Sequence, residues 1–415
     1  MIALDVILLL LAAGLLVPSL MLAVEVLASL LPRRPALPDE TPRPNVAVIV
    51  PAHNEAELLP RTLALLQAGL TDEDRLIVVA DNCSDATAQV ARDAGAECVE
   101  RHDTERRGKG YALDAGMQHL QAEGTLPPVV IFNDADVLAD AEAIDLLARQ
   151  VVATGLPAQA CYLMAVPESA GRQGMVSRFA LVLKNYVRPL GLDRLGVPCP
   201  LFGSGMAFPV GLATKMSLAT GDLVEDMRLG LQLCRDGHGP RFCPRALVQG
   251  ELPADGAIAA SQRRRWEHGH LSVFLATPAL LLAGLRRGSL ATIVAALDHA
   301  VLPLTILAGG ILAIVTATTT RILTLQPTTL SMIALATATA SIGLLLVAVG
   351  LTWLGHLRRQ IPASSLLGLP AYVVRRVPNQ AAFVFRRQRD WVRTPRAHER
   401  LDDAASPNSS AASPN

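Results

Sequence analysis

Apolar residues gather at the two ends of this chain, and the middle alternates between short apolar runs and polar segments. Val6 to about Leu31 is almost uninterrupted apolar sequence, which is long enough to cross a bilayer. Two further apolar runs, from Leu290 to about Val315 and from Leu330 to about Trp353, predict two more spans. The pattern therefore predicts a membrane protein with a soluble middle section.

Two acidic residues interrupt these apolar runs. Glu25 lies near the inner end of the first run, where it is expected to reach the lipid headgroups. Asp298 lies inside the second run and leaves two alternatives. Either it has a function within the membrane, or the span starts about a turn later, near Ala300.

Arginine pairs orient the predicted spans, because cytoplasmic flanks are enriched in Lys and Arg. One pair follows the first span, one precedes the second and one follows the third: Arg33-Arg34, Arg286-Arg287 and Arg358-Arg359. The connection between the last two spans, Thr318–Gln326, holds a single arginine, Arg321. The middle section is therefore expected on the cytoplasmic side and the N-terminus outside.

The remaining segments near the membrane are shorter or strongly basic. Leu271–Leu285 predicts a helix lying in the interface, and Leu366–Trp391 predicts a basic amphipathic segment, with a core-packed helix pair as its alternative. The Ser-, Pro- and Asn-rich end is expected to be disordered. We expect five parts: an N-terminal anchor at 1–32, a cytoplasmic domain at 45–270, an interfacial helix with two spans at 271–359, a basic segment at 360–400 and a tail at 401–415.

The middle section alternates apolar, β-branched runs with helical patterns. This order predicts a parallel sheet covered by helices, an α/β fold in which ligands bind beyond the carboxyl ends of the strands. The predicted strands are Asn45–Val50, Leu76–Ala80, Cys98–Glu100 and Val129–Phe132. The predicted helices are Asn54–Ala68 with Asn54 as its N-cap, Ser84–Ala94 and Gly110–Gln121.

Composition excludes several classes of function. The 415 residues carry a formal net charge of +0 and only 4% aromatic side chains, which argues against a nucleic-acid partner. Six scattered cysteines form no CxxC pair, so a zinc site has no support, and we expect free thiols. Neither GxGxxG nor GxxxxGK[ST] follows the first strand, so phosphates must be held in another way, for which a divalent cation is the obvious candidate.

Two acidic motifs end predicted strands and suggest binding chemistry. Asp134 and Asp136 flank one small residue, and two carboxylates so placed fit Mg²⁺ or Mn²⁺, although a solvated turn is the alternative. Asp81-Asn82 suits a nucleoside base or ribose, with a helix cap as the alternative. Glu55 has the same alternative, and Lys109 is either a phosphate ligand or part of a solvated basic loop.

Three motifs lie further along the chain. Glu225-Asp226 offers a carboxylate that takes a proton from an attacking hydroxyl, or merely complements a helix dipole. In Gln262–Trp266, Arg265 suits a diphosphate and Trp266 an apolar face of a sugar, with a plain basic patch as the alternative. The two glycines of Gly203–Phe208 permit close approach to a ligand or mark a bulged strand. The histidines, including His53, show no metal-ligand spacing.

This ordered set of motifs resembles the family 2 glycosyltransferases, and most closely their membrane-embedded branch of cellulose, chitin and hyaluronan synthases and ceramide glucosyltransferases. The resemblance covers about Asn45 to Trp266 together with the flanking spans. It implies a GT-A, Rossmann-like nucleotide-sugar domain with a mostly parallel sheet, flanked by transmembrane and interfacial helices. It also implies inverting transfer from a UDP sugar, with Mg²⁺ or Mn²⁺ as cofactor.

The resemblance also implies a role for each matching position. Catalysis falls to Asp226 as general base and to Arg265, which neutralises the leaving diphosphate. Metal binding falls to Asp136 and Asp134. The nucleotide sugar is expected to contact Glu55, Asp81, Lys109, Asp134, Gln262, Arg265 and Trp266. The acceptor side is expected to comprise Gly203, Ser204, Gly205, Glu225 and Trp266.

The acceptor stays open at this point. We expect a hexosyltransferase of the bacterial inner membrane that adds one sugar or a few to a lipid-linked or polysaccharide acceptor, in exopolysaccharide or glycolipid biosynthesis. The alternative is a processive synthase that makes and exports a β-linked homopolymer. Only three predicted spans and no soluble domain after Arg359 favour the first. Expected partners are membrane lipids and membrane proteins of polysaccharide assembly.

Two other classes of protein explain less of the sequence. A degenerate, non-catalytic scaffold is disfavoured because all the expected acidic positions are filled. A nucleotidyltransferase also uses carboxylates and a metal, but it does not explain Glu225-Asp226 followed by Gln262–Trp266.

Overall fold

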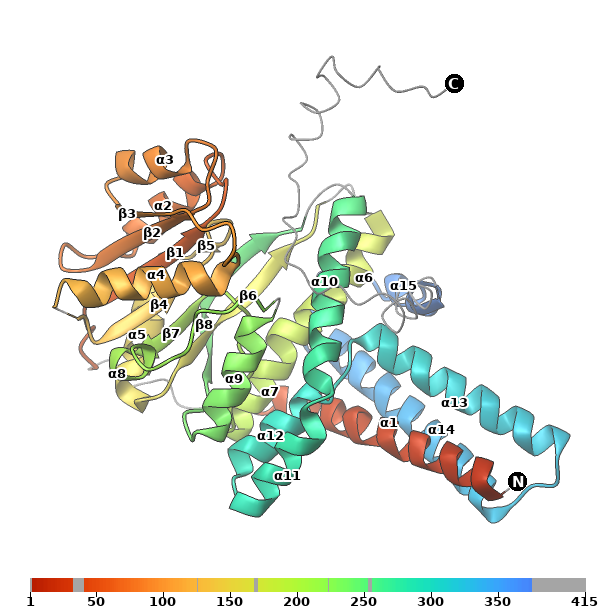
Figure 1. Cartoon of the computed structure of the whole chain (residues 1–415). Helices are drawn as coiled ribbons and strands as arrows, with labels where there is room; N and C mark the ends of the chain where they lie inside the picture. The colour runs from red at the N-terminus through yellow and green to blue at the C-terminus, as the bar shows by residue number, and fades with distance from the viewer. Residues whose placement is uncertain are drawn as a thin grey trace, which may run out of the picture.

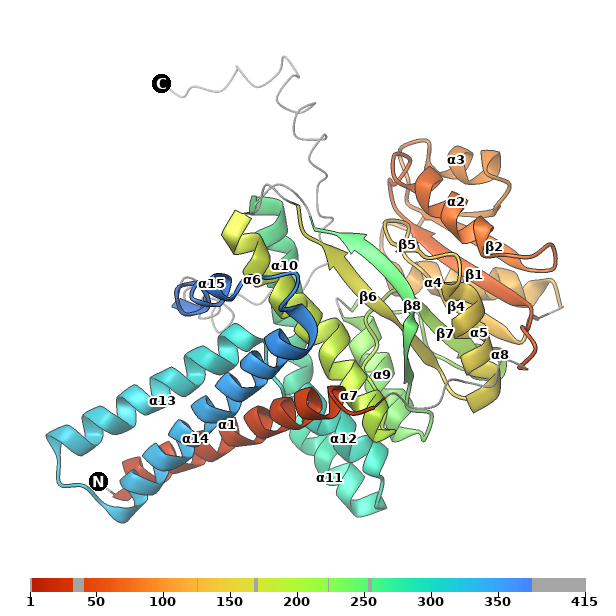
Figure 2. The same ribbon diagram turned by 180° about the vertical axis from the view of Figure 1, so that it is seen from behind.

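The computed structural model describes residues 2–32, 41–124, 126–167, 171–222, 224–252 and 256–374. A sheet with helices against it forms one part of the molecule, and long helices projecting from it form the other (Figure 1). Seen from behind, three of these helices, α1, α13 and α14, run side by side away from the sheet (Figure 2). They are α1 (Ile2–Ser29), α13 (Leu304–Thr324) and α14 (Thr329–Thr352), the last extended by a π-helical turn, Trp353–Leu357.

The sheet has eight strands in the order β3-β2-β1-β4-β7-β6-β8-β5. The first four pair in parallel, β7 is antiparallel to both of its neighbours, β6 and β8 are parallel, and β5 is antiparallel to β8. The prediction of an α/β fold with a mostly parallel sheet is confirmed. The strands are β1 (Val46–Ala52), β2 (Arg75–Asp81), β3 (Glu97–Arg101), β4 (Val129–Phe132), β5 (Leu138–Ala139), β6 (Ala158–Ala165), β7 (Met206–Pro209) and β8 (Arg241–Glu251).

Helices cover both faces of this sheet because its strands are apolar on both sides. In β1, Val46, Val48 and Val50 face one core, whereas Ala47 and Ile49 face the other. The helices of this part are α2 (Leu59–Ala68), α3 (Thr87–Asp93), α4 (Lys109–Ala122), α5 (Ala143–Thr154), α6 (Gly171–Val182), α7 (Arg188–Leu195), α8 (Val210–Ala213) and α9 (Glu225–Arg235). A π-helical turn, Leu183–Val187, joins α6 to α7.

Two predicted helix starts are wrong. The helix expected from Asn54 begins at Leu59, and the one expected from Ser84 begins at Thr87. Asn54 takes a positive φ of 54° and, instead of capping a helix, accepts a hydrogen bond from the Ser84 N–H at 2.7 Å. Asn tolerates this left-handed conformation better than other non-glycine residues, so the polar segment forms a loop at the strand end.

The second predicted span also has different bounds. The apolar run from Leu290 divides into α12 (Leu290–His299) and α13, with Pro303 between them. Proline lacks an amide hydrogen and disfavours helical backbone in the residue before it, so the helix cannot run through Leu302. Asp298 consequently lies before the span, which agrees with the alternative that the span starts later in the sequence than the apolar run.

Other expectations near the membrane are corrected in detail. Leu271–Leu285 is not one helix, because α10 (Gly256–Phe274) ends inside it and α11 (Thr277–Arg287) starts anew at an angle of 44°. Arg321 is not a loop residue, since α13 continues to Thr324 and Arg321 pairs with Asp5 at 3.0 Å. Glu25 is fully buried rather than directed to the headgroups.

Within the described ranges, three helices, α1, α13 and α14, are long and apolar enough to cross a membrane, and the number rises to four if the bent pair of α10 and α11 counts as one span. Their lengths fit the thickness of a bilayer core. The described chain ends with a short helix, α15 (Ala363–Leu366), in an apolar stretch that reaches Val374. The arginines of the predicted basic segment, Arg33-Arg34 and the tail lie outside the described residues. The domain boundaries given above stay predictions.

Candidate active site

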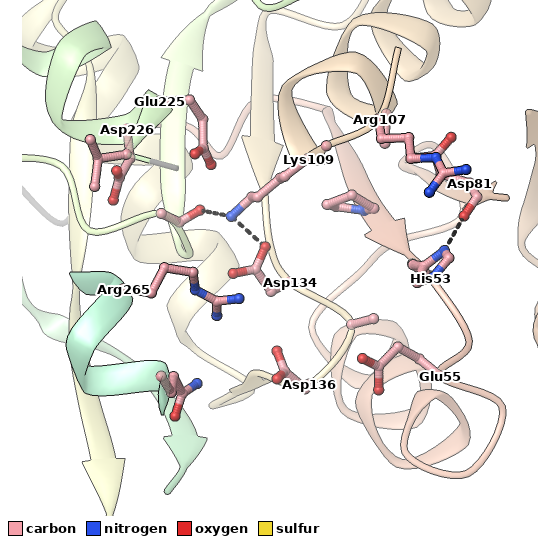
Figure 3. Close-up of a pocket in the computed structure, with 18 of the residues that line it drawn as sticks. His53, Glu55, Asp81, Arg107, Lys109, Asp134, Asp136, Glu225, Asp226 and Arg265 are labelled. Atoms are coloured by element: carbon pink, nitrogen blue, oxygen red, sulfur yellow. Dashed lines mark hydrogen bonds and ion pairs between the residues drawn. The ribbon is translucent and has the colours of Figure 1, made fainter. Parts of the chain in front are cut away.

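A cleft of about 730 Å³ opens at the carboxyl ends of β1, β2 and β4 and is closed on the other side by α9 and α10. This is the edge where parallel α/β sheets bind ligands. The predicted site residues that line it are Glu55, Asp81, Lys109, Asp134, Asp136, Gly203, Glu225, Asp226, Gln262, Arg265 and Trp266. Figure 3 labels the charged residues among them. Segments more than two hundred residues apart in sequence therefore meet in one cavity.

Asp81 ends β2 and is fixed by an arginine from the neighbouring strand. The Arg101 guanidinium donates to Asp81 Oδ1 at 2.6 Å, and the Asn82 side-chain amide donates to the same oxygen at 3.0 Å. The Arg101 guanidinium also lies over the Tyr111 ring, 5.4 Å from its centroid. His53 Nδ1 lies 2.6 Å from the Asp81 carbonyl oxygen (Figure 3). Asp81 is thus a buried and preoriented carboxylate at the wall of the cleft.

Lys109 and Asp134 form the charged centre of the cleft. Lys109 Nζ lies 2.5 Å from Asp134 Oδ1 and donates to the Gly203 carbonyl oxygen at 2.6 Å (Figure 3). Burial lowers the pKa of Lys109, but the charges of Asp134 and the Glu225–Asp226 pair outweigh burial and raise it overall. Burial raises the pKa of Asp134, against the opposing charge of Lys109. A partly buried ammonium is therefore held charged among carboxylates.

Asp134 and Asp136 lie on a tight turn after β4, not on alternate positions of a continuing strand. The Val137 N–H closes this turn on the Asp134 carbonyl oxygen at 3.1 Å. The Asn133 side-chain amide donates to the carbonyls of Asp134 and Val137, at 3.0 and 2.8 Å. The Asp134 N–H donates to Ser204 Oγ at 2.9 Å. Both carboxylates face the cleft because buried Ala135 anchors the turn between them.

Glu225 and Asp226 begin α9, where the Met227 N–H donates to Asp226 Oδ1 at 2.8 Å. Burial, together with the charge of Asp226, raises the pKa of Glu225 to about 7. Burial also raises the pKa of Asp226, against the opposing charge of Lys109. Because the helix N-terminus favours anions, these shifts show that loss of water dominates at this position.

The Gly203–Phe208 stretch divides into a residue that lines the cleft and two that support its wall. Gly203 has φ of +89°, and a Cβ built on it would lie 3.3 Å from Asp226 Oδ2, so glycine permits the approach. Ser204 is fully buried behind the Asp134 turn. Gly205 has φ of +64° and packs against Ala160 and Val248 of β6 and β8. Ser204 and Gly205, expected on the acceptor side, do not line the cleft.

Helix α10 supplies Gln262, Arg265 and Trp266 to the cleft. The Gln262 Oε1 atom is buried and has no hydrogen-bond partner among the described residues. Buried acceptors are normally satisfied, so this oxygen points to a donor on a bound molecule. The helical spacing places residues 262, 265 and 266 on one face, which explains why this motif needs positions three and four apart.

Several residues that line the cleft were not predicted from the sequence. Lys184 and Asn185 come from the π-helical turn, and Tyr162 comes from β6. A lone lysine beside an asparagine within the apolar stretch from Phe179 to Val187 was the available signal. His53, interpreted as an ordinary polar residue, also lines the cleft.

A different group of side chains has the spacing of metal ligands. Glu97, His119 and Glu123 place their ligand atoms within 4.8 Å of one another, and theirs is the one such three-residue group found in the described ranges. Arg75 already pairs with both carboxylates, at 2.5 and 2.6 Å. Arg75 therefore already offsets part of the negative charge of this partly exposed cluster.

Residues 42–269 match the family described as glycosyltransferase like family 2. The chain belongs to this family. It is 36% identical over 98 residues to the 4,4'-diaponeurosporenoate glycosyltransferase of Staphylococcus haemolyticus, covering 22% of this chain and 24% of that protein. It is 23% identical over 244 residues to the probable glycosyltransferase YdaM of Bacillus subtilis, covering 56% of each. The chain thus spans about a quarter to about half the length of these curated relatives.

This family 2 chain also resembles a solved structure along most of its length. The mannosyltransferase PcManGT of Pyrobaculum calidifontis, in complex with GDP-Man and Mn²⁺, is 20% identical with a TM-score of 0.50. The match covers 92% of this chain and 96% of that one. At this identity the likeness establishes the fold, and the expected GT-A fold is confirmed.

Proposed function

We propose that this chain is a membrane-bound, inverting glycosyltransferase that moves a sugar from a nucleotide sugar to a lipid-linked or polysaccharide acceptor. The observation that carries the proposal is the cleft itself, which unites the Asp134–Asp136 turn, the Asp226 carboxylate and the Arg265 guanidinium. A UDP sugar is the expected donor, and the GDP-Man held by the mannosyltransferase of similar fold makes a GDP sugar the comparison to test.

Donor binding falls to one side of the cleft. Asp81, held by Arg101, and Glu55 face the nucleoside, while Lys109 and Asp134 lie toward the phosphates. A divalent cation fits Asp136 and Asp134, because two carboxylates plus diphosphate oxygens are a usual environment for Mg²⁺ or Mn²⁺. When bound, the ion offsets negative charge on the diphosphate. Mn²⁺ accompanies the donor in the mannosyltransferase of similar fold.

Transfer requires a base for the acceptor hydroxyl. Asp226 takes this proton as the hydroxyl oxygen bonds to the anomeric carbon and the bond from that carbon to the diphosphate breaks. The raised pKa of Asp226, which comes mainly from burial, makes it a better base than an ordinary carboxylate. Arg265 faces the departing diphosphate, and Gln262 Oε1 accepts a hydrogen bond from a ligand hydroxyl.

Glu225 has a separate task beside Asp226. With its pKa raised to about 7 it exchanges protons near neutrality, and its charge sets the electrostatic surroundings of the base. Trp266 gives the sugar an apolar wall. Gly203 permits the acceptor to approach Asp226, and Ser204 and Gly205 support the acceptor side from behind the wall.

The membrane association rests on the three long apolar helices. We infer a multi-pass protein of the bacterial inner membrane with its catalytic domain in the cytoplasm. The C-terminal end of α1 and the π-helical turn after α14 lie together at the catalytic side, where Ser29 Oγ is 2.9 Å from His356 Nε2. Arg358-Arg359 follows directly, in agreement with a cytoplasmic flank.

Product analysis in lipid nanodiscs tests this function. Purified protein receives radiolabelled UDP and GDP sugars, Mg²⁺ or Mn²⁺ and a total bacterial lipid extract. One discrete labelled product that extracts with lipid is expected. A ladder or a large water-soluble product would instead identify a processive synthase, and no incorporation from any donor would reject the transferase.

A further inference from the structure

A second cavity, of about 140 Å³, lies next to the catalytic cleft on the side of the long helices. Its walls come from α1, α6, α10, the segment before α13 and the apolar stretch that ends at Val374; examples are Leu22, Ala180, Leu302 and Tyr372. The lining is predominantly aliphatic and aromatic. A dry apolar cavity of about 150 Å³ is known to bind a molecule as large as benzene, so this one accepts a short apolar segment.

The cavity and the catalytic cleft share part of their walls. Leu181, Lys184 and Trp266 line both. One molecule can therefore place an apolar segment in the cavity and a polar group in the cleft without crossing a protein wall.

The position of the cavity identifies the kind of molecule. Leu22 belongs to α1, and Leu304 and Thr305 begin α13, so two of the candidate spans contribute to its lining. An apolar ligand at the end of spanning helices comes from the bilayer, because hydrocarbon is concentrated there. The lining also includes polar residues such as Glu267 and His270, but aliphatic and aromatic residues outnumber them, so a hydrocarbon chain fits this cavity better than a growing polysaccharide.

The junction also carries two polar side chains, Lys184 and Asn185. Asn185 is 6% exposed, lines the cleft, and its Oδ1 has no hydrogen-bond partner among the described residues. Lys184 has no ion-pair partner within 4 Å in the part of the chain that is described, although the Asp226 charge acts on it. Both residues lie in the π-helical turn, and such turns are frequent at functional sites.

We propose that the acceptor is a hydroxyl-bearing membrane lipid whose chain occupies this cavity next to its headgroup, with Asn185 and Lys184 contacting that headgroup. Asn185 Oδ1 accepts from a headgroup hydroxyl, and Lys184 Nζ donates to a headgroup oxygen. A second hydroxyl then lies toward Asp226. This inference rests on the proposed function and selects the lipid from its two acceptor classes.

Filling the cavity tests the proposal. Ala180 lines the cavity but not the cleft, so Ala180→Trp should block the chain while leaving the donor site intact. We expect at least a tenfold loss of transfer into the lipid extract in nanodiscs, with unchanged affinity for the nucleoside diphosphate by calorimetry. Ala279→Trp, on the exposed face of α11, is the matched control and should keep wild-type transfer.

Photo-crosslinking gives a readout that does not depend on turnover. Wild-type protein in nanodiscs doped with a bifunctional diacylglycerol, carrying a diazirine in its acyl chain, should be labelled on α6 around Ala180. Ala180→Trp should lose this label, and Ala279→Trp should keep it. If residues 375–400 of this chain fill the cavity instead, the α6 label will be absent from the wild type and the proposal fails.

The headgroup contacts are tested by Asn185→Leu, which is near in volume and lacks the polar atoms. The KM for lipid should rise at least fivefold, and the KM for the donor should stay unchanged. Two outcomes would overturn the lipid site but not the proposed function. One is transfer to a soluble oligosaccharide instead of lipid, and the other is unchanged transfer to lipid by Ala180→Trp. Absence of transfer from every donor, in the wild type as well, rejects the proposed function itself.

Discussion

Arg188 of α7 donates from Nε to Glu25 of α1 at 2.6 Å, across 163 positions of sequence and with both side chains buried. The same guanidinium donates to the Asp298 carboxylate at 2.6 Å and to its backbone carbonyl at 2.8 Å. A candidate span, the helix that follows the π-helical turn, and α12 are thus joined through one cation. The ion-pair cluster connects the membrane part to the element that carries Lys184 and Asn185.

Removing the central cation should destabilise the protein strongly. Arg188→Ala removes the arginine that Glu25 and Asp298 share, and breaking a buried pair typically costs about 3–5 kcal/mol. A marked fall in the midpoint of thermal unfolding in detergent is expected. Arg92→Ala, in the exposed pair with Glu100, should leave the midpoint unchanged.

A triple variant separates the charge from the packing. Glu25→Met, Arg188→Met and Asp298→Leu together replace the whole cluster by apolar groups, which is often neutral for stability. We expect this variant to recover most of the midpoint lost by Arg188→Ala. Equal instability of both variants would show that shape, rather than charge pairing, governs this junction.

Asp226→Asn should separate chemistry from binding. The amide keeps the shape and the contact with the Met227 N–H but cannot take a proton, and a general base contributes roughly 10²- to 10⁴-fold. We expect transfer to fall within that range while nucleotide affinity, measured by calorimetry, stays near that of the wild type. Near-normal turnover would remove Asp226 from the role of base.

The acidic limb of the pH profile should lie above the usual range for carboxylates. Asp226 and Glu225 both have raised pKa values. As the solution is acidified, these two carboxylates therefore become protonated at a higher pH than an exposed carboxylate does. Transfer is therefore expected to fall as pH decreases below about 7. Because Asp226 and Glu225 interact, the apparent pKa values of the profile describe the two carboxylates together rather than either one alone.

Glu225→Gln should shift this limb to lower pH. Glutamine cannot take up the proton that Glu225 binds near pH 7, so the part of the fall in transfer that follows this proton should disappear from the profile. The measurement is kcat/KM against pH for the wild type and the variant. A limb that does not move would mean that Glu225 does not act on the base.

Metal dependence should be located at Asp136. Asp136→Ala is expected to abolish both donor binding and turnover, and chelation of divalent ions should do the same to the wild type. Binding of Mn²⁺ is followed by electron paramagnetic resonance. The control is Glu123→Gln, which alters the group of Glu97, His119 and Glu123 outside the cleft and should retain donor binding and turnover. If Glu123→Gln loses Mn²⁺ binding and Asp136→Ala does not, the ion belongs to that group instead.

Much of the cleft was predictable because its residues follow buried strands. The apolar runs ending at Ala52, Asp81 and Phe132 become neighbouring parallel strands, so their polar followers had to meet at one edge. Asn54 was misread because local propensity favours Asn both as a helix cap and in left-handed loops. Its hydrogen bond with Ser84, thirty residues away, decided between them.

The sequence by itself determined the family, the α/β core and the existence of three long apolar helices, since motif order and hydrophobic run length are local properties of a chain. Only the tertiary structure decided which buried groups are partners. It placed Glu25 on Arg188, put Ser204 behind the Asp134 turn, and joined Lys184 and Asn185 to the cleft and its apolar neighbour. These relations depend on contacts between distant segments, whose free energies exceed the weak local preferences that a sequence pattern records.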